Sequence, residues 1–112
     1  MSAPLLLHQL VLESPERVGD GAGGFVQTWV ALGTLWVSLE ARGGRGVAQT
    51  GAAVSRAAYR IVVRGAPMGA PDRPRPGQRF RDGSRLFHIE AVTERDPRAR
   101  YLVCHAHEEV AI

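Results

Sequence analysis

The chain has 112 residues, of which 45% are hydrophobic and 22% charged, and it carries one cysteine. These values predict a single domain, 1–112, that folds around one core without disulfides or a structural metal. The apolar runs are far shorter than the ~20 residues of a membrane helix, and residues 1–12 lack the basic start of a secretory signal. We therefore expect a soluble intracellular protein.

The charge is unevenly placed along the chain. All 14 basic residues are arginines; residues 41–85 carry a net charge of +8, whereas residues 1–40 carry −3 and residues 86–112 carry −2. Arginine pairs with phosphate oxygens through two donors, so a basic middle is compatible with contact to nucleic acid. The alternative, which we favour, is that the codon usage of the genome favours Arg over Lys, and that opposite charges meet between subunits or strands.

Two-residue alternation of apolar and polar side chains is typical of strands and recurs along the whole chain. Residues 6–13 form the first predicted strand, which Ser14 and Pro15 end. Residues 18–24 hold four glycines and predict a flexible hairpin tip. Residues 25–41 predict two short strands around a bend, or one strand with a bulge at Gly33. Within them we expect Trp29 and Trp36 to be packed aromatics, or one of them to anchor a partner surface.

Two long loops, about 43–56 and 65–77, separate the remaining predicted strands. Residues 57–64 form a strand between the loops, and residues 78–81 and 85–92 flank Asp82-Gly83, which predicts a type I′ hairpin turn. Residues 100–107 form the last strand. The pattern predicts an all-β fold, a small antiparallel β-barrel or sandwich of about seven short strands with two long loops.

The residues that could carry chemistry assemble no active site. His105 and His107, with His88 from the preceding hairpin, are the best metal candidates, but a structural zinc site needs four ligands at recognisable spacing. Cys104 and His105 are neighbours on a strand, so they point to opposite faces and cannot share a proton. We therefore expect no metal, no cofactor, no small-molecule substrate and no enzymatic activity.

Five blocks of sequence, taken in order, resemble the phage head-tail joining family, also called head-closure or stopper proteins, of tailed phages, prophages and gene transfer agents. The blocks are Leu6-x-His8-x-Leu10-x-Leu12 with Pro15; Gly23-Gly24-x-x-x-Thr28-Trp29 with Leu35-Trp36-Val37 and Leu39-Glu40; Arg60-Ile61-x-Val63-Arg64; Arg79-Phe80 with Gly83-x-Arg85-x-Phe87-x-Ile89-x-x-Val92; and Arg100-x-Leu102-x-Cys104.

The resemblance implies a small β-barrel that acts as a structural virion assembly protein. Such proteins form a homo-oligomeric ring, twelve-fold by family expectation, between the portal or adaptor protein above and a tail completion protein below. The ring closes the DNA exit channel and gives the tail a docking surface. The protein would be made in the bacterial cytoplasm and reside in the head-tail neck of the particle. The core positions that match the family are Trp29, Trp36, Phe80, Phe87 and Ile89.

Two sets of residues are candidates for contacts in such a ring. The acid-free loop 43–56 either approaches packaged double-stranded DNA in the channel or, as we favour, wraps a neighbouring subunit. Its candidate residues are Gly43, Gly44, Arg45 and Arg56. The second set would make ion pairs between subunits, with Arg60 and Arg64 of one copy meeting Glu40 or Glu90 of the next.

Two other functions remain open. A barrel that binds single-stranded nucleic acid would need aromatic platforms beside a basic groove, and residues 41–85 offer only Tyr59 and Phe80. Another neck or tail-completion component of similar size is the second alternative.

Overall fold

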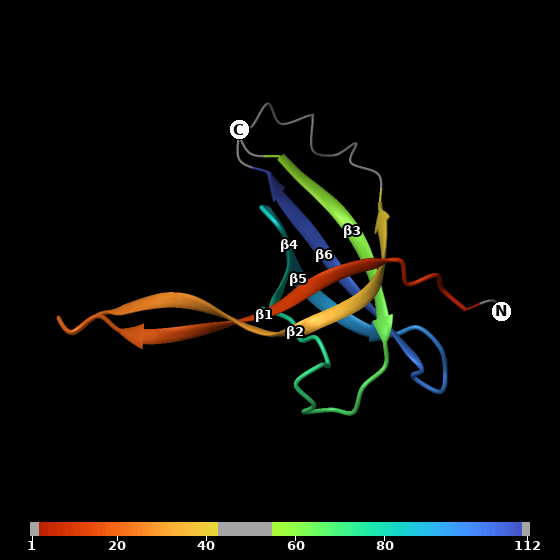
Figure 1. The fold of residues 1–112 in the computed structure, drawn as a ribbon, viewed down its shortest axis with the longest axis horizontal. Helices are drawn as coiled ribbons and strands as arrows, with labels where there is room; N and C mark the ends of the chain where they lie inside the picture. Colours follow the sequence, from red (N-terminus) through yellow and green to blue (C-terminus); the bar gives the residue numbers. More distant parts are fainter. Residues whose placement is uncertain (1–2, 43–54, 111–112) are drawn as a thin grey trace.

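The alternating segments of the sequence pair as antiparallel strands that close on themselves (Figure 1). The computed structural model describes residues 3–42 and 55–110. The strands are β1 (His8–Gly19), β2 (Phe25–Ala41), β3 (Ser55–Arg64), β4 (Arg79–Asp82), β5 (Arg85–Glu94) and β6 (Tyr101–Val110). Around the barrel they follow the order β1-β2-β3-β6-β5-β4, and β4 pairs with β1 to complete the ring of strands.

This arrangement confirms the all-β class and selects the barrel over the sandwich. The described residues form six strands rather than about seven, because 25–41 is one continuous strand. Ser55 and Arg56, predicted to lie in a loop, belong to β3, and the rest of that predicted loop, 43–54, lies outside the described residues. Residues 65–77 form a loop as predicted. No helix in the described part of the chain is long and apolar enough to span a membrane.

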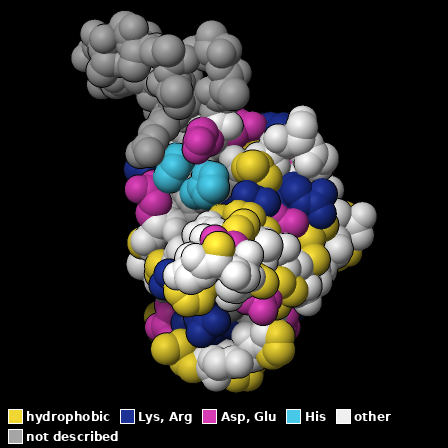
Figure 2. Space-filling model, turned by 90° about the vertical axis from the view of Figure 1, so that its left-hand side faces the viewer, with side chains coloured by type: hydrophobic (Ala, Val, Ile, Leu, Met, Phe, Trp, Pro, Cys, Tyr) yellow, Lys and Arg dark blue, Asp and Glu magenta, His cyan; other side chains and the backbone are white. Residues whose placement is uncertain are grey.

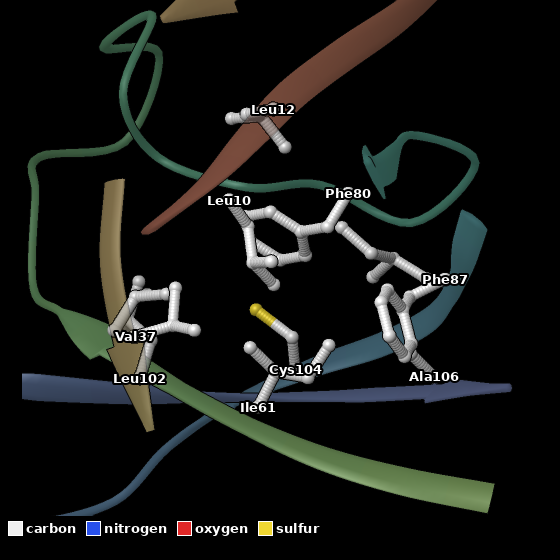
Figure 3. Close-up of a cluster of buried hydrophobic side chains, with 11 residues drawn as sticks. Leu10, Leu12, Val37, Ile61, Phe80, Phe87, Leu102, Cys104 and Ala106 are labelled. Carbon is white, nitrogen blue, oxygen red and sulfur yellow. The ribbon is translucent and has the colours of Figure 1, made fainter. Parts of the chain in front are cut away.

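The core lies inside the barrel and receives side chains from every strand (Figure 3). Alternate residues of a strand point to opposite faces of the sheet, so a closed sheet collects one set of alternate side chains in its interior. These side chains are large and apolar in β4 and β5, and smaller in β6. The core consists of Leu10, Leu12, Val37, Ile61, Val63, Phe80, Phe87, Ile89, Leu102, Cys104 and Ala106.

A bulge in β2 allows one long strand to serve two parts of the structure. The pairing of β1 with β2 shifts between Leu12 and Glu13, which face Gly33 and Ala31, so Leu32 is the extra residue. Gly33 has a φ of 155°, a conformation that favours glycine. A bulge bends the strand and increases its twist. The prediction of one strand with a bulge at Gly33 is therefore confirmed.

The first strand does not end at Ser14 and Pro15, as the sequence predicts, but continues to Gly19. β1 pairs with β4 only over Val11–Glu13, so its continuation is an edge that pairs with β2 alone. Asp20 donates its amide to the Gly24 carbonyl at 3.1 Å. Alternate pairs along an antiparallel ribbon exchange hydrogen bonds, which places Pro15 in a pair whose amide positions point away from β2. The missing N–H of proline costs nothing there.

The turn between β4 and β5 lies one residue later than the sequence predicts. Asp82 and Arg85 are paired, so Gly83 and Ser84 are the central residues. Gly83 has a φ of 60°, whereas Ser84 does not have a positive φ. A positive φ at the first central position alone is the type II′ pattern rather than type I′. Both types need a positive φ at the first central position, and Gly83 supplies it in the observed turn. The Asp82-Gly83 pair therefore located the hairpin but not its register.

One end of the barrel is filled by an ion pair. Glu108 of β6 faces inward and is buried, and the Arg85 guanidinium donates to both of its oxygens, at 2.7 and 3.0 Å. Arg85 also donates to the Tyr59 hydroxyl at 3.1 Å. The hydrogen bond from Arg85 holds the pKa of Glu108 below its ordinary value despite burial, which opposes the shift. A carboxylate can therefore lie inside this end of an otherwise apolar barrel.

The burial of Cys104 predicts an inert thiol. Removal from water raises the pKa of Cys104 to about 12, and the thiolate is the reactive form of cysteine. We expect a maleimide reagent to modify the native chain only as fast as the chain unfolds, and to modify it rapidly in urea, as measured by mass spectrometry. Ser84→Cys, a second thiol in an exposed turn, is the internal control. Equal modification rates for both thiols in the native chain would contradict the prediction.

Candidate functional site

The outstanding surface feature is a two-stranded extension, which we call the ribbon and define as residues 14–19 of β1 and 25–32 of β2. Figure 1 shows it projecting from the barrel on the left. At ~3.3 Å per residue it reaches roughly 20 Å beyond the barrel wall. A two-stranded ribbon is only marginally stable alone in water. Contacts made by its two faces must therefore stabilise the ribbon.

The two faces of the ribbon differ in chemistry. Directly paired residues share a face, and Val18 pairs with Val26 while Pro15 pairs with Trp29. One face, which we call the anchored face, turns toward the outer surface of β4 and β5, and there Arg17 lies 4.4 Å from the Phe25 ring centroid. The opposite face, which we call the open face, has exposed apolar side chains. These are Val18, Val26, Val30 and Leu32.

A buried carboxylate lies where the ribbon leaves the barrel. Glu13 of β1 is buried on the outer face of the barrel and accepts from Arg79 Nε at 2.7 Å and from Arg81 Nε at 2.8 Å, both on β4. The strand register produces this geometry. Glu13 pairs with Arg79, and Val11, two residues earlier on the same face of β1, pairs with Arg81. One carboxylate thus joins the two strands that close the barrel.

Electrostatics keep Glu13 ionised. Burial alone would raise the pKa of Glu13, but hydrogen bonds from Arg81 and Arg79 and the charges of both guanidinium groups outweigh it and lower the pKa. The Glu13 carboxylate also lies between the guanidinium groups of Arg79 and Arg81 on β4 and offsets the repulsion between these two positive charges. Removal of the carboxylate would leave two adjacent cations without a counter-ion.

Trp29 anchors the ribbon against the barrel through a stack of side chains. The Arg79 guanidinium carbon lies 4.0 Å from the Trp29 ring centroid, a cation-π contact. The other neighbour of Trp29 is His88 of β5, edge to face at 6.2 Å between centroids, and His88 stacks on His107 of β6 at 5.4 Å. Arg79 therefore serves both Glu13 and Trp29, so the barrel seam and the ribbon anchor share a side chain.

The stacked histidines form a polar surface beside the ribbon. Figure 2 shows histidine side chains gathered next to acidic and basic side chains on the face seen from the ribbon's side. His107 Nδ1 lies 3.1 Å from Glu90 Oε1, within ion-pair distance but without hydrogen-bond geometry. His88 Nε2 lies 4.0 Å from Glu109 Oε2. His105 is placed elsewhere, with its Nε2 3.3 Å from the Thr93 hydroxyl.

These positions alter the metal candidates named from the sequence. The structure brings His88 and His107 together and separates His105 from them, although all three face outward. Among the residues that the structure describes, no group of three histidine, cysteine or acidic side chains is arranged to hold a metal ion.

The two tryptophans have different environments. Trp29 is half-buried at the ribbon anchor, whereas Trp36 is 55% exposed. The expectation that Trp36 is a packed core aromatic is therefore wrong, because its place on β2 turns it outward while the adjacent Val37 faces the core. The other expected core positions, Phe80, Phe87 and Ile89, lie inside the barrel.

The candidates for ion pairs between subunits have neighbours within the chain. Glu40 and Arg60 are directly paired across β2 and β3, and Glu90 lies beside His107. Arg64 is exposed, with its guanidinium carbon 6.0 Å from the Tyr101 ring centroid. Ion pairs of these residues between subunits remain a prediction.

The candidate channel loop falls largely outside the described residues. Gly43, Gly44 and Arg45 are not among them, and Arg56 is described only as a backbone position of β3, paired with Glu109. Contact of these residues with packaged DNA or with a neighbouring subunit remains a prediction.

The aromatic side chains do not favour the nucleic-acid alternative. Phe80 is fully buried, and Tyr59 is half-buried with its ring edge against Phe87 at 5.1 Å. Single-strand binding requires aromatic faces open to stacking with bases. Neither of the two aromatics that the sequence offered presents such a face among the described contacts.

The sequence analysis missed the ion-pair role of the most connected residues of this surface, namely Glu13, Arg79 and Arg81. A weak signal existed, because Glu13 directly follows the alternating Leu10 and Leu12 and so occupies a strand position next to the core. Nothing local indicated its partners, since Arg79 is 66 residues away in sequence.

Substitution of Glu13 tests the ion pairs with Arg79 and Arg81 that join β1 to β4. We expect Glu13→Gln to lower the free energy of unfolding at pH 7 by about 2 kcal/mol, below the cost of breaking a fully buried pair because Arg81 is partly open to solvent. The folded-state pKa of Glu13 is lowered from 4.5, so its stabilisation is present above that pH and is lost as the pH falls below it. Urea denaturation should show the two chains converging in acid. The control Glu16→Gln should change stability by less than about 0.5 kcal/mol. Equal losses for both variants would contradict this account.

Substitution of the two tryptophans tests the ribbon anchor. We expect Trp29→Ala to lower the free energy of unfolding by about 2 kcal/mol and to speed amide hydrogen exchange in residues 14–19 and 25–32, because the cation-π and ring contacts are lost. Trp36→Ala, at an exposed position of the same strand, should cost less than about 1 kcal/mol. Unchanged exchange of the ribbon in Trp29→Ala would show that the stack does not hold it.

Comparison with solved structures finds the same architecture in a particle component. A chain of the "Virion of native gene transfer agent (GTA) particle" is 46% identical, with a TM-score of 0.80, covering 98% of this chain and 100% of that chain. Protein SF1141 from Shigella flexneri 2a is 20% identical, with a TM-score of 0.68 and 96% of each chain covered, which shows a shared fold alone. No curated protein sequence matches the chain significantly.

The family comparison agrees with the first of these structures. The model of the family described as "Phage head completion protein" matches residues 1–109, which includes all six described strands, the ribbon and its anchor. With this match over nearly the whole chain, the protein belongs to the phage head completion protein family.

Proposed function

We propose that this protein forms a ring in the head-tail neck of a phage-like particle, where it closes the DNA exit channel and presents the tail docking surface. The observation that carries the proposal is the 46% identity, over 98% of the chain, to a component of a gene transfer agent virion. Membership in the head completion family makes the protein a structural component of head assembly. The proposal adds where in the particle it acts and how.

The fold supports a structural role of this kind. Each barrel strand has a paired neighbour on both sides over part of its length, so the free backbone edges of the described barrel are short. Contacts with other copies and proteins would then be made mainly by side chains, by loops and by the ribbon. The proposal requires no chemical step, and the described residues place Cys104, the strongest nucleophile, in the core.

The partners follow from the position in the particle. A ring in the neck, twelve-fold by the family resemblance, would meet the portal or its adaptor on one side and a tail completion protein on the other. The structure has distinct features at its two sides, the projecting ribbon and the surface around the N-terminal segment (Figure 1). Another neck or tail-completion component would use the same features with different partners.

Deletion of the gene from its particle-producing strain tests the proposal. We expect heads that package DNA, lose it to added nuclease and lack tails, as counted by electron microscopy and by the amount of protected DNA. Expression of the full chain from a plasmid should restore tailed particles. Tailed, DNA-retaining particles from the deletion strain would overturn the proposal, and tailed but empty particles would assign the protein to another step.

A further inference from the structure

We propose that the ribbon's open face docks onto a second copy of this chain, in a hollow beside Trp36, so that copies join head to tail. This inference rests on the proposed ring and deepens it by naming the two surfaces that meet.

The open face of the ribbon exposes several apolar side chains, which is unusual for a narrow two-stranded structure. Its side chains are 38 to 52% exposed, although they belong to valine and leucine. The Glu16–Thr28 pair separates Val18 and Val26 from Val30 and Leu32 on this face. Exposed apolar side chains gathered on one face mark an interaction site. The barrel of the same chain contacts the opposite face through Trp29, so the covering surface for the exposed valines would come from another molecule.

A second apolar surface lies at the opposite end of the β1–β2 sheet. Leu5 and Leu7, in the segment before β1, are 73% and 68% exposed, and Trp36 is 55% exposed. Beside them is a hollow of about 340 Å³. Its walls come from the N-terminal segment, from β2 and from the loop after β3. They are Leu6, Leu35, Trp36, Arg64, Gly65 and Asp72.

The two surfaces complement each other in shape and in charge. The ribbon is a projection with an apolar face, and the hollow is a recess with an apolar lining and an exposed tryptophan, a residue enriched at the centres of interfaces. Glu16 shares the open face with the valines, because it lies two residues from Val18 on β1. Arg64 lies on the wall of the hollow together with Asp72, so the docked Glu16 would have to lie on the Arg64 side. An ion pair between Glu16 of one copy and Arg64 of the next would fix the register of docking.

Placement of the surfaces at opposite ends determines the symmetry. One copy uses its ribbon and the next uses its hollow, so the contact is heterologous and each copy keeps its other surface free for a further copy. Repetition of such a contact produces a ring when the rotation closes. A second, larger hollow is lined by Ser14 and Pro15 at the root of the same ribbon, together with residues of the loop 65–77. Docking at that larger hollow would instead place the ribbon of one copy against the root of the ribbon of the next copy.

Charge reversal tests the contact in assembled particles. We expect Glu16→Arg or Arg64→Glu, each in the full chain, to reduce the number of copies per particle by about tenfold, and the two together to restore it, because the attraction is re-formed with opposite signs. Gln27→Glu, which adds a single negative charge on the anchored face, is the control and should incorporate normally. A double variant that remains as defective as the single ones would overturn the proposal.

Cysteine cross-linking tests the geometry independently of any loss of folding. In purified particles, Val26→Cys together with Trp36→Cys should give a ladder of disulfide-linked multimers, while each single variant should give none, since Cys104 is buried. Dimers from Val26→Cys alone would show ribbons pairing with each other, and cross-links of Val26→Cys to Met68→Cys would place the ribbon at the larger hollow. Either result would overturn the proposal, as would the absence of a ladder.

The outcomes separate this inference from the proposed function. If deletion of the gene blocks tail attachment while the double cysteine variant assembles without cross-links, the role in the neck holds and the docking scheme is wrong. If deletion leaves tailed particles intact, the proposed function fails whatever the cross-links show.

Discussion

The carboxylate of Glu13, held between Arg79 and Arg81, is the interaction on which the rest of the structure depends. It lies at the last pair of residues that β1 makes with β4, so it fixes the point where the barrel closes. The same Arg79 supports the Trp29 ring. Closure of the barrel and orientation of the ribbon are therefore not independent, because one guanidinium group serves both.

This coupling suits a protein whose function lies in contacts rather than in chemistry. The barrel supplies a rigid base, with a packed core along its length and an Arg85–Glu108 ion pair filling one end. The ribbon extends from that base at an angle set by side chains of β1, β2, β4 and β5. A partner that binds the ribbon would meet a surface already held in position, which lowers the entropy lost on association.

Local patterns in the sequence were sufficient for most of the fold. Alternation identified the strands, and glycines identified the bulge at Gly33 and the turn at Gly83, because both positions need backbone angles that other residues adopt at a cost. The end of β1 was mispredicted at Pro15, since proline excludes a central strand but not an edge, and the edge arises only from tertiary pairing. Of the two alternatives predicted for 25–41, the single strand holds, because a bulge rather than a turn lies at Gly33.

The candidate site was much less predictable than the fold. Glu13 accepts hydrogen bonds from two arginines, Arg79 and Arg81, that are 66 and 68 residues away in sequence. The local sequence around Glu13 gives no indication of such distant partners. The exposure of Trp36 also depends on register, because a shift by one residue would turn it inward. The sequence also offered the alternative in which a tryptophan faces a partner; Trp36 is exposed, and its contact with a partner remains a prediction.

Pro15 has a further consequence for the life of the protein before assembly. An unpaired strand edge is a template on which other chains can add by backbone hydrogen bonding, which leads to aggregation. Pro15 removes a donor near the barrel end of that edge on β1. Addition of another chain along this edge by backbone hydrogen bonding is thus interrupted at Pro15, while side-chain contacts of the ribbon remain open to other partners.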